Sequence, residues 1–192
     1  LLFILLTLCP QIDTIIQQAI SDKLIPGAVV CKVENEQITY LEAFGNRAIT
    51  PKQEKMTTST IFDLASCSKS TGAGTLIMQL AMEGRLNVDD PVKKYLPLWP
   101  DSAHVRHLLT HSSGLPGYLS AIQVDKSYME HRKTQKIKRP QFLIDTICLT
   151  PRLSGIGEKY RYSCLNFITL QDVAQKIVGT DINTYLRHGL YK

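Results

Sequence analysis

The sequence predicts a mixed fold of the α/β (α+β) type, in which a helical region accompanies an antiparallel sheet. Two apolar, β-prone runs at 28–33 and 38–44 are separated by a polar segment, which is the pattern of an antiparallel hairpin. Several downstream segments repeat apolar residues at helical spacing. With 192 residues, 44% of them hydrophobic, the chain is long enough for a domain with a core of its own.

The chain divides into an N-terminal segment at 1–10 and a domain at 11–192. Residues 1–8 are apolar apart from Thr7 and are too few to span a bilayer. They are either the core of a secretory signal or an ordinary apolar segment, and both interpretations stay open. A helix at 13–23 follows, because its isoleucines recur at helical spacing, and Ile25-Pro26-Gly27 ends it. The hairpin comes next and closes at Gly45.

From Ile61 onwards the apolar pattern is helical, and the longest helix is predicted to end at Gly84. Its buried face is expected to carry Leu64, Ala73, Leu76, Ile77, Leu80 and Ala81. Further helices are predicted at 105–110, 141–149 and 167–178, with a turn at 113–117. A two-stranded hairpin is marginally stable alone, so we expect more strands beyond Lys192, and hence a sheet whose C-terminal strands are missing from this chain.

Cysteine usage and charge restrict the function classes. The five cysteines include Cys9 and Cys164 and have neither a CxxC pair nor zinc-like spacing, so we expect no disulfide framework. Cys31, Cys67 and Cys148 are interpreted as small buried hydrophobes. The net charge of +5 is mild, and much of it lies at 126–139. Such a run is usually a solvated helix face or loop, and the lack of interleaved aromatic residues beyond Tyr128 argues against a nucleic-acid site.

Ser66 and Lys69 lie three residues apart at the start of the long predicted helix, so their side chains share a face. A serine hydroxyl is a weak nucleophile until a neighbouring group accepts its proton. Lysine does so only if burial or positive charge lowers its pKa, and we expect the apolar helix to bury Lys69. The spacing alone occurs by chance, but its position at a helix start favours stabilisation of negative charge.

Several motifs in order resemble the β-lactamase-related serine hydrolases, which include class C β-lactamases, D-alanyl-D-alanine peptidases and family esterases. The matching segments are Ile25-Pro26-Gly27-Ala28, Phe44-Gly45, the Ser66 motif, Gly84-Arg85-Leu86, Asp89-Asp90-Pro91-Val92, Tyr95-Leu96-Pro97 and 108–115. The resemblance implies a β-lactamase/transpeptidase-like fold. It also implies that a later strand would carry a Lys-Thr-Gly or His-x-Gly element and supply one oxyanion N–H.

The family's second motif, Tyr-x-Asn, is similar to Tyr162-Ser163-Cys164. The resemblance implies that Tyr162 shares the proton transfer with Lys69. Cys164 replaces the asparagine and is a poor partner for a substrate amide, which disfavours β-lactam and peptide turnover more than ester hydrolysis. We therefore place Cys164 and, as a nearby substitute, Asn166 in the substrate-binding set.

The three histidines at 104, 107 and 111 have a spacing that could mimic metal ligands on a helix. Apart from the more distant Asp101, no cysteine or carboxylate completes such a site within the segment, so we expect no metal and no cofactor. The resemblance instead makes His111 a structural landmark.

The sequence therefore predicts a serine hydrolase that forms an acyl-enzyme on Ser66 from an ester, amide or β-lactam carbonyl. Its expected partner is a small-molecule or peptidoglycan-like acyl substrate, with no nucleic acid, and peripheral membrane association would occur through the N-terminus. The family's envelope substrates imply a periplasmic or extracellular location. Two alternatives remain: a catalytically inactive binding or scaffold protein of the same fold, and a basic nucleic-acid binder acting through 126–139.

Overall fold

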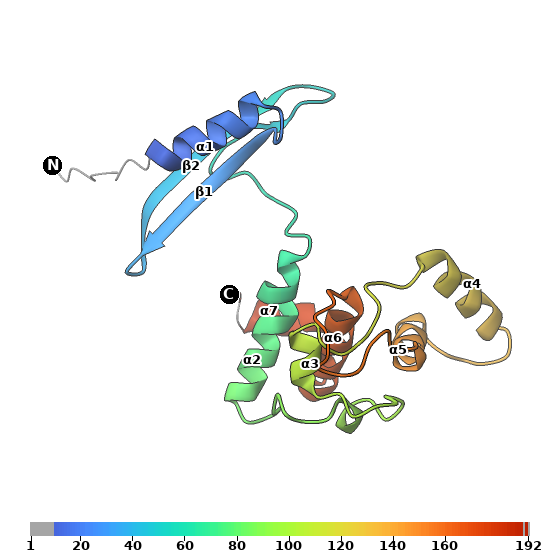
Figure 1. Cartoon of the computed structure of the whole chain (residues 1–192). Helices are drawn as coiled ribbons and strands as arrows, with labels where there is room; N and C mark the ends of the chain where they lie inside the picture. The colour runs from blue at the N-terminus through green and yellow to red at the C-terminus, as the bar shows by residue number, and fades with distance from the viewer. Residues whose placement is uncertain (1–9, 190, 192) are drawn as a thin grey trace. The chain divides into compact units, whose positions relative to one another are not determined.

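The computed structural model describes residues 10–189 and residue 191 (Figure 1). The predicted signal-like segment therefore lies outside the described residues, apart from the backbone of Pro10. The chain separates into two compact units, one that ends at Asp63 and one that begins at Leu64.

The first unit is a helix and a small antiparallel sheet. Helix α1 (Pro10–Ser21) is followed by β1 (Gly27–Glu34), β2 (Gln37–Ala48) and the short β3 (Glu54–Lys55), in the sheet order β1-β2-β3. The hairpin is confirmed, and its two-residue turn places Asn35 and Glu36 at positive φ. A hydrogen bond from the Tyr40 hydroxyl to Asp13 ties β2 to α1. The predicted helix begins earlier than expected, β2 continues beyond residue 44, and β3 had no sequence signal.

The second unit is helical. Its elements are the π-helical turn η1 (Lys69–Gly74), α2 (Thr75–Met82), the 3₁₀ turn η2 (Val92–Lys94), α3 (Val105–Leu109), α4 (Ala121–His131), α5 (Arg139–Leu149), α6 (Cys164–Val178) and α7 (Ile182–His188). Helix α6 packs against η1, α2, α3, α5 and α7. The helices predicted near α2, α3, α5 and α6 are confirmed, and α6 ends at Gly179 with positive φ as expected.

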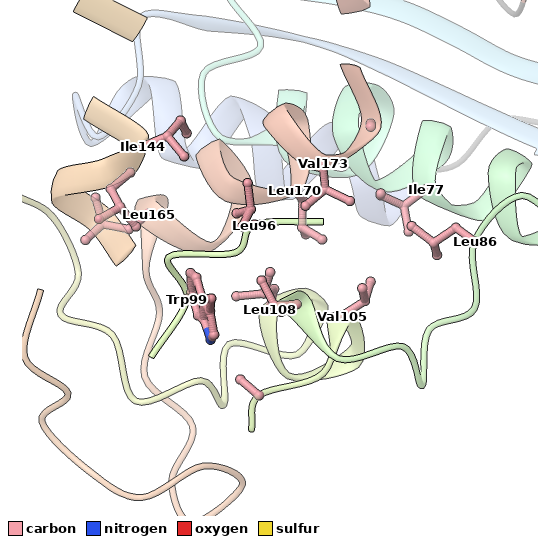
Figure 2. Close-up of a cluster of buried hydrophobic side chains, with 14 of the residues drawn as sticks. Ile77, Leu86, Leu96, Trp99, Val105, Leu108, Ile144, Leu165, Leu170 and Val173 are labelled. Carbon is pink, nitrogen blue, oxygen red and sulfur yellow. The ribbon is translucent and has the colours of Figure 1, made fainter. Parts of the chain in front are cut away.

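The core of the second unit is a continuous apolar cluster around α6 (Figure 2). Leu170 and Val173 of α6 meet Ile77 of α2 and Leu108 of α3, and all four side chains are fully buried. Trp99 is almost fully buried in the same cluster and donates its indole N–H to Asp101 at 2.6 Å. The cluster therefore supports α6, the helix whose first residue is Cys164, from several sides.

The long helix predicted from Ile61 starts later than its apolar pattern indicates. Residues 61–64 are not helical, and Leu64 is 53% exposed rather than part of the buried face. Ala65 has a φ of +43°, which no continuing α-helix contains, so a turn separates the apolar run from the helix. The Leu64 prediction was wrong because helical spacing does not reveal where the backbone turns.

Two of the three cysteines expected in the core are at the surface. Cys148 on α5 is 1% exposed, and burial raises the pKa of its thiol to about 11. Cys31 and Cys67 are exposed: Cys31 is the first exposed residue along β1, and Cys67 lies in the first turn after Ser66. The basic run at 126–139 is exposed along α4 and the connection to α5, as predicted. Across the described residues, we find no helix with the length and apolar character needed to cross a bilayer.

Candidate active site

Ser66 lies at a sharp turn that opens the helical segment leading to α2. The N–H groups of Cys67, Ser68 and Lys69 bond the carbonyls of residues 64, 65 and 66, respectively. A π-helical turn follows, in which the Thr75 N–H reaches back to the Ser70 carbonyl. π-Helical turns are rare and often occur at functional sites. The Ser66 side chain and N–H therefore lie at the N-terminal end of this helical segment, where negative charge is favoured.

Three polar side chains meet at Ser66. The Lys69 ammonium donates to Ser66 Oγ at 3.0 Å, and the Tyr162 hydroxyl donates to the same oxygen at 2.8 Å. Lys69 Nζ also lies 5.1 Å from the centre of the Tyr162 ring. Tyr162 comes from the segment before α6, 96 residues away in sequence. The structure thus brings together the three residues for which the sequence predicts catalytic roles.

The backbone on either side of Tyr162 is fixed by the loop at 111–117. The Arg161 N–H donates to the His111 carbonyl at 2.8 Å, and the Ser163 N–H donates to His111 Nδ1 at 3.1 Å. The Ser163 hydroxyl donates to the Pro116 carbonyl at 2.6 Å. His111 also packs its ring against that of Tyr162, with centroids 4.6 Å apart. Tyr162 is therefore held by backbone and ring contacts although its own side chain is 44% exposed.

Asn166 belongs to this support and not to the substrate surface. Its side chain is fully buried, accepts from the Ser113 hydroxyl at 2.6 Å and lies 3.3 Å from His111 Nδ1. The prediction that Asn166 contacts substrate was wrong, because its polar atoms are occupied inside the protein. Sequence reasoning did not assign a role to Ser113, which is also fully buried, although it falls within the matched motif at 108–115.

The histidine is neutral in this arrangement. Its Nδ1 accepts the Ser163 N–H, which requires the proton to be on Nε2. Burial lowers the pKa of His111, and the nearby positive charge of Lys69 lowers it further. His104 and His107, the other two histidines considered as metal ligands, have separate partners. His107 Nδ1 accepts the His104 backbone N–H, and His104 Nδ1 contacts the Asp89 carbonyl.

Lys69 is not buried in the way the sequence led us to expect. Its interaction with the Tyr162 hydroxyl raises its pKa above 10.5, outweighing the opposing effect of burial, and the Cys164 thiol adds to the rise. Conversely, its interactions with Lys69 and Ser66 lower the pKa of Tyr162 below 10. The expectation that Lys69 has a depressed pKa was wrong. At neutral pH Lys69 is an ammonium, and Tyr162 is the group whose deprotonation is favoured.

A hollow of about 400 Å³ lies beside Lys69, one of the three side chains. Lys69 and Cys164 line it together with Phe167 and Ile168 of α6 and Leu186 of α7. Cys164 therefore lies beside the polar cluster at the first residue of α6, where the sequence places a substrate-binding residue.

The chain is similar to several known proteins. A family model described as Beta-lactamase matches residues 12–192. Protein flp of Staphylococcus aureus (strain NCTC 8325 / PS 47) is 27% identical over 189 residues, which are 95% of this chain and 36% of that protein. The chain thus spans little more than a third of the length of this curated relative.

Two solved structures are similar in fold. EstCE1, a hydrolase with promiscuous acyltransferase activity, has a TM-score of 0.74 and 25% identity, over 93% of this chain and 49% of that one. A class C beta-lactamase in complex with cefoxitin has a TM-score of 0.75 and 24% identity, over 94% of this chain and 47% of that one. The predicted fold class and family resemblance are both confirmed. The chain belongs to the beta-lactamase family of serine hydrolases.

Proposed function

We propose that the chain forms an acyl-enzyme on Ser66 and hydrolyses carboxylic esters. The observation that carries the proposal is the convergence of Lys69 and Tyr162 on Ser66 Oγ at 3.0 and 2.8 Å. Family membership supports serine hydrolase chemistry, while the acyl substrate and the activity of this chain are our inference.

The raised pKa of Lys69 and the lowered pKa of Tyr162 indicate how the proton moves. Tyr162 as phenolate accepts the Ser66 proton over their existing contact, while the Lys69 ammonium stabilises the phenolate. Ser66 Oγ then bonds to the carbonyl carbon, and the Ser66 N–H stabilises the oxyanion. Collapse of this intermediate expels the alcohol, which takes the proton from Tyr162. Water attacks the acyl-Ser66 ester by the same route and releases the carboxylic acid.

An ester is favoured over an amide or a β-lactam because of Cys164. A thiol is a weak hydrogen-bond donor and acceptor, so it gives little stabilisation to a substrate amide beside the reacting carbonyl. An ester without such an amide loses nothing at this position. We further propose a small-molecule substrate, no nucleic acid partner, and a periplasmic or extracellular location with peripheral membrane attachment through the N-terminal segment.

The test is hydrolysis of p-nitrophenyl acetate, compared between the chain and its Ser66→Ala variant. We expect a burst of about one p-nitrophenolate per chain that the variant lacks, and little hydrolysis of a chromogenic cephalosporin. Ester turnover that survives in Ser66→Ala would contradict the proposal. Ligand binding without any burst on a folded chain would favour instead a binding protein that has kept the fold, which the replacement of asparagine by Cys164 also allows.

A further inference from the structure

A second hollow, lined mainly by apolar side chains, lies between α4, α5 and α6. Its volume is about 450 Å³, within the range of roughly 300–1,000 Å³ typical of small-molecule sites. Apolar side chains from three helices and a loop line it, chiefly Leu119, Val124, Leu143, Leu165 and Ile168. A hollow of this size and lining suits an apolar chain or ring.

The wall formed by α4 is held in place by its contacts with α5. The rings of Tyr128 and His131 pack on Phe142 with centroids 5.5 and 5.3 Å apart. Arg139 forms an ion pair with Asp125 across the two helices. Both charged groups line the hollow, and because they neutralise each other they do not favour a charged ligand. In Figure 1, α4 lies on the outer side of α5, away from α2 and α3.

The apolar hollow and the hollow beside Lys69 share part of their lining. Cys164 and Ile168 line both this hollow and the one that contains Lys69. The Cys164 N–H donates to the Gly117 carbonyl at 2.8 Å, and the next residue, Tyr118, also lines the apolar hollow. The segment that places Tyr162 beside Ser66 thus forms the near end of the apolar hollow.

Cys164, which stands where the family motif has an asparagine, gives a physical reason for an apolar ligand in this hollow. An amide facing an alkyl chain here would lose hydrogen bonds to water without recovering them, which costs free energy. A cysteine thiol behaves as a small hydrophobe, so an alkyl chain can pass it without that cost. The same residue that disfavours an amide substrate therefore favours an aliphatic one.

We propose that this hollow binds the aliphatic acyl chain of the substrate, so that the preferred ester carries a straight acyl chain of several carbons. The inference rests on acyl transfer at Ser66 and adds the substrate class to it. In the reaction, Ser66 takes the acyl group and the alcohol leaves with the proton. The hydrocarbon tail stays between α4, α5 and α6 until water releases the fatty acid.

The experiment compares p-nitrophenyl acetate with p-nitrophenyl hexanoate. Each methylene that leaves water contributes about 0.8 kcal/mol, or roughly a fourfold gain in kcat/KM, so we expect hexanoate to exceed acetate by at least about tenfold. Val124→Trp fills the hollow from the half-buried face of α4 and should lower the hexanoate-to-acetate ratio at least about tenfold. Ile122→Trp is the matched control, since Ile122 lies on the same helix and is 69% exposed. It should leave the ratio at the wild-type value.

Two further measurements separate this inference from the proposed reaction. Cys164→Asn places an amide beside the hollow and should also lower the hexanoate-to-acetate ratio, with folding checked by circular dichroism. Titration of octanoate by calorimetry needs no turnover, and the wild-type chain should bind it at least about tenfold more tightly than Val124→Trp. If Ser66 takes no label but octanoate binding depends on residue 124, the hollow assignment stands and the reaction is wrong. Equal ester ratios and equal octanoate binding in Val124→Trp and the wild type would overturn the hollow assignment.

Discussion

Replacing Tyr162 by phenylalanine removes one hydroxyl from the cluster at Ser66 and should slow acylation by about a hundredfold to ten-thousandfold, the usual contribution of a general base. The change deletes the 2.8 Å contact with Ser66 Oγ and leaves the 3.0 Å contact from Lys69. Lys69 does not replace the lost base at neutral pH, because a lysine of ordinary pKa, about 10.4, is an ammonium that donates to Ser66 Oγ and does not accept its proton. The ring of Tyr162 is retained, so its packing on His111 should persist.

The pH dependence makes this prediction specific. In the wild type, labelling of Ser66 by a fluorophosphonate should accelerate as pH rises and Tyr162 loses its proton, with an apparent pKa below 10. Tyr162→Phe should lack that rise. Rates would be followed by intact mass between about pH 6 and 10, with Tyr160→Phe as the control, since Tyr160 is 73% exposed and contacts His111 only through its ring. A wild-type rate and pH slope in Tyr162→Phe would refute Tyr162 as the base.

Three predictions concern stability, each measured by urea unfolding. The Asp90 carboxylate accepts a hydrogen bond from the Tyr95 hydroxyl at 2.5 Å, which is the main cause of its pKa of about 2. Asp90→Asn should therefore lower the free energy of unfolding by about 1–2 kcal/mol at pH 7. Because the folded-state pKa lies below the ordinary 3.8, this contribution should fade in the wild type as pH falls from about 4 to 2, and an unchanged acid profile in the variant would contradict it. Asn166→Ala should lower the free energy of unfolding by about 2–3 kcal/mol, since it removes the acceptor for the buried Ser113 hydroxyl proton, and a loss below about 0.5 kcal/mol would argue against the support role. Gly114→Ala should lower the free energy of unfolding by about 2–3 kcal/mol, because Gly114 has a φ of +81° and a Cβ would lie 2.3 Å from the Ser154 carbonyl oxygen. An unchanged midpoint of urea unfolding would contradict this and show that the loop shifts freely.

The sequence predicts best what local pattern determines. Alternating β-prone residues around a polar turn predicted β1 and β2, and helical spacing with a terminal glycine predicted the end of α6 at Gly179. Helix α4 was missed because none of its residues is buried, so its sequence has no core-facing stripe. Its apolar residues Ile122 and Met129 are both exposed.

Site geometry was predictable in part. The three-residue spacing predicted the contact between Lys69 and Ser66, because it depends only on the local helix. The ionisation of Lys69 was not predictable, since it depends on how Tyr162 packs against it across the fold. Asn166 was misassigned because it lies two residues after Cys164, and two helical positions turn a side chain to a different face of α6.

The activation of Ser66 is tested most directly by the intact mass of the chain after incubation with a fluorophosphonate, compared with that of Ser66→Ala. We expect one adduct per chain in the wild type and none in the variant, because Lys69 and Tyr162 both contact the Ser66 hydroxyl. Circular dichroism of both samples would establish that each is folded. A folded wild-type chain that takes no adduct, or a Ser66→Ala chain that keeps it, would contradict the claim that Ser66 is an activated nucleophile.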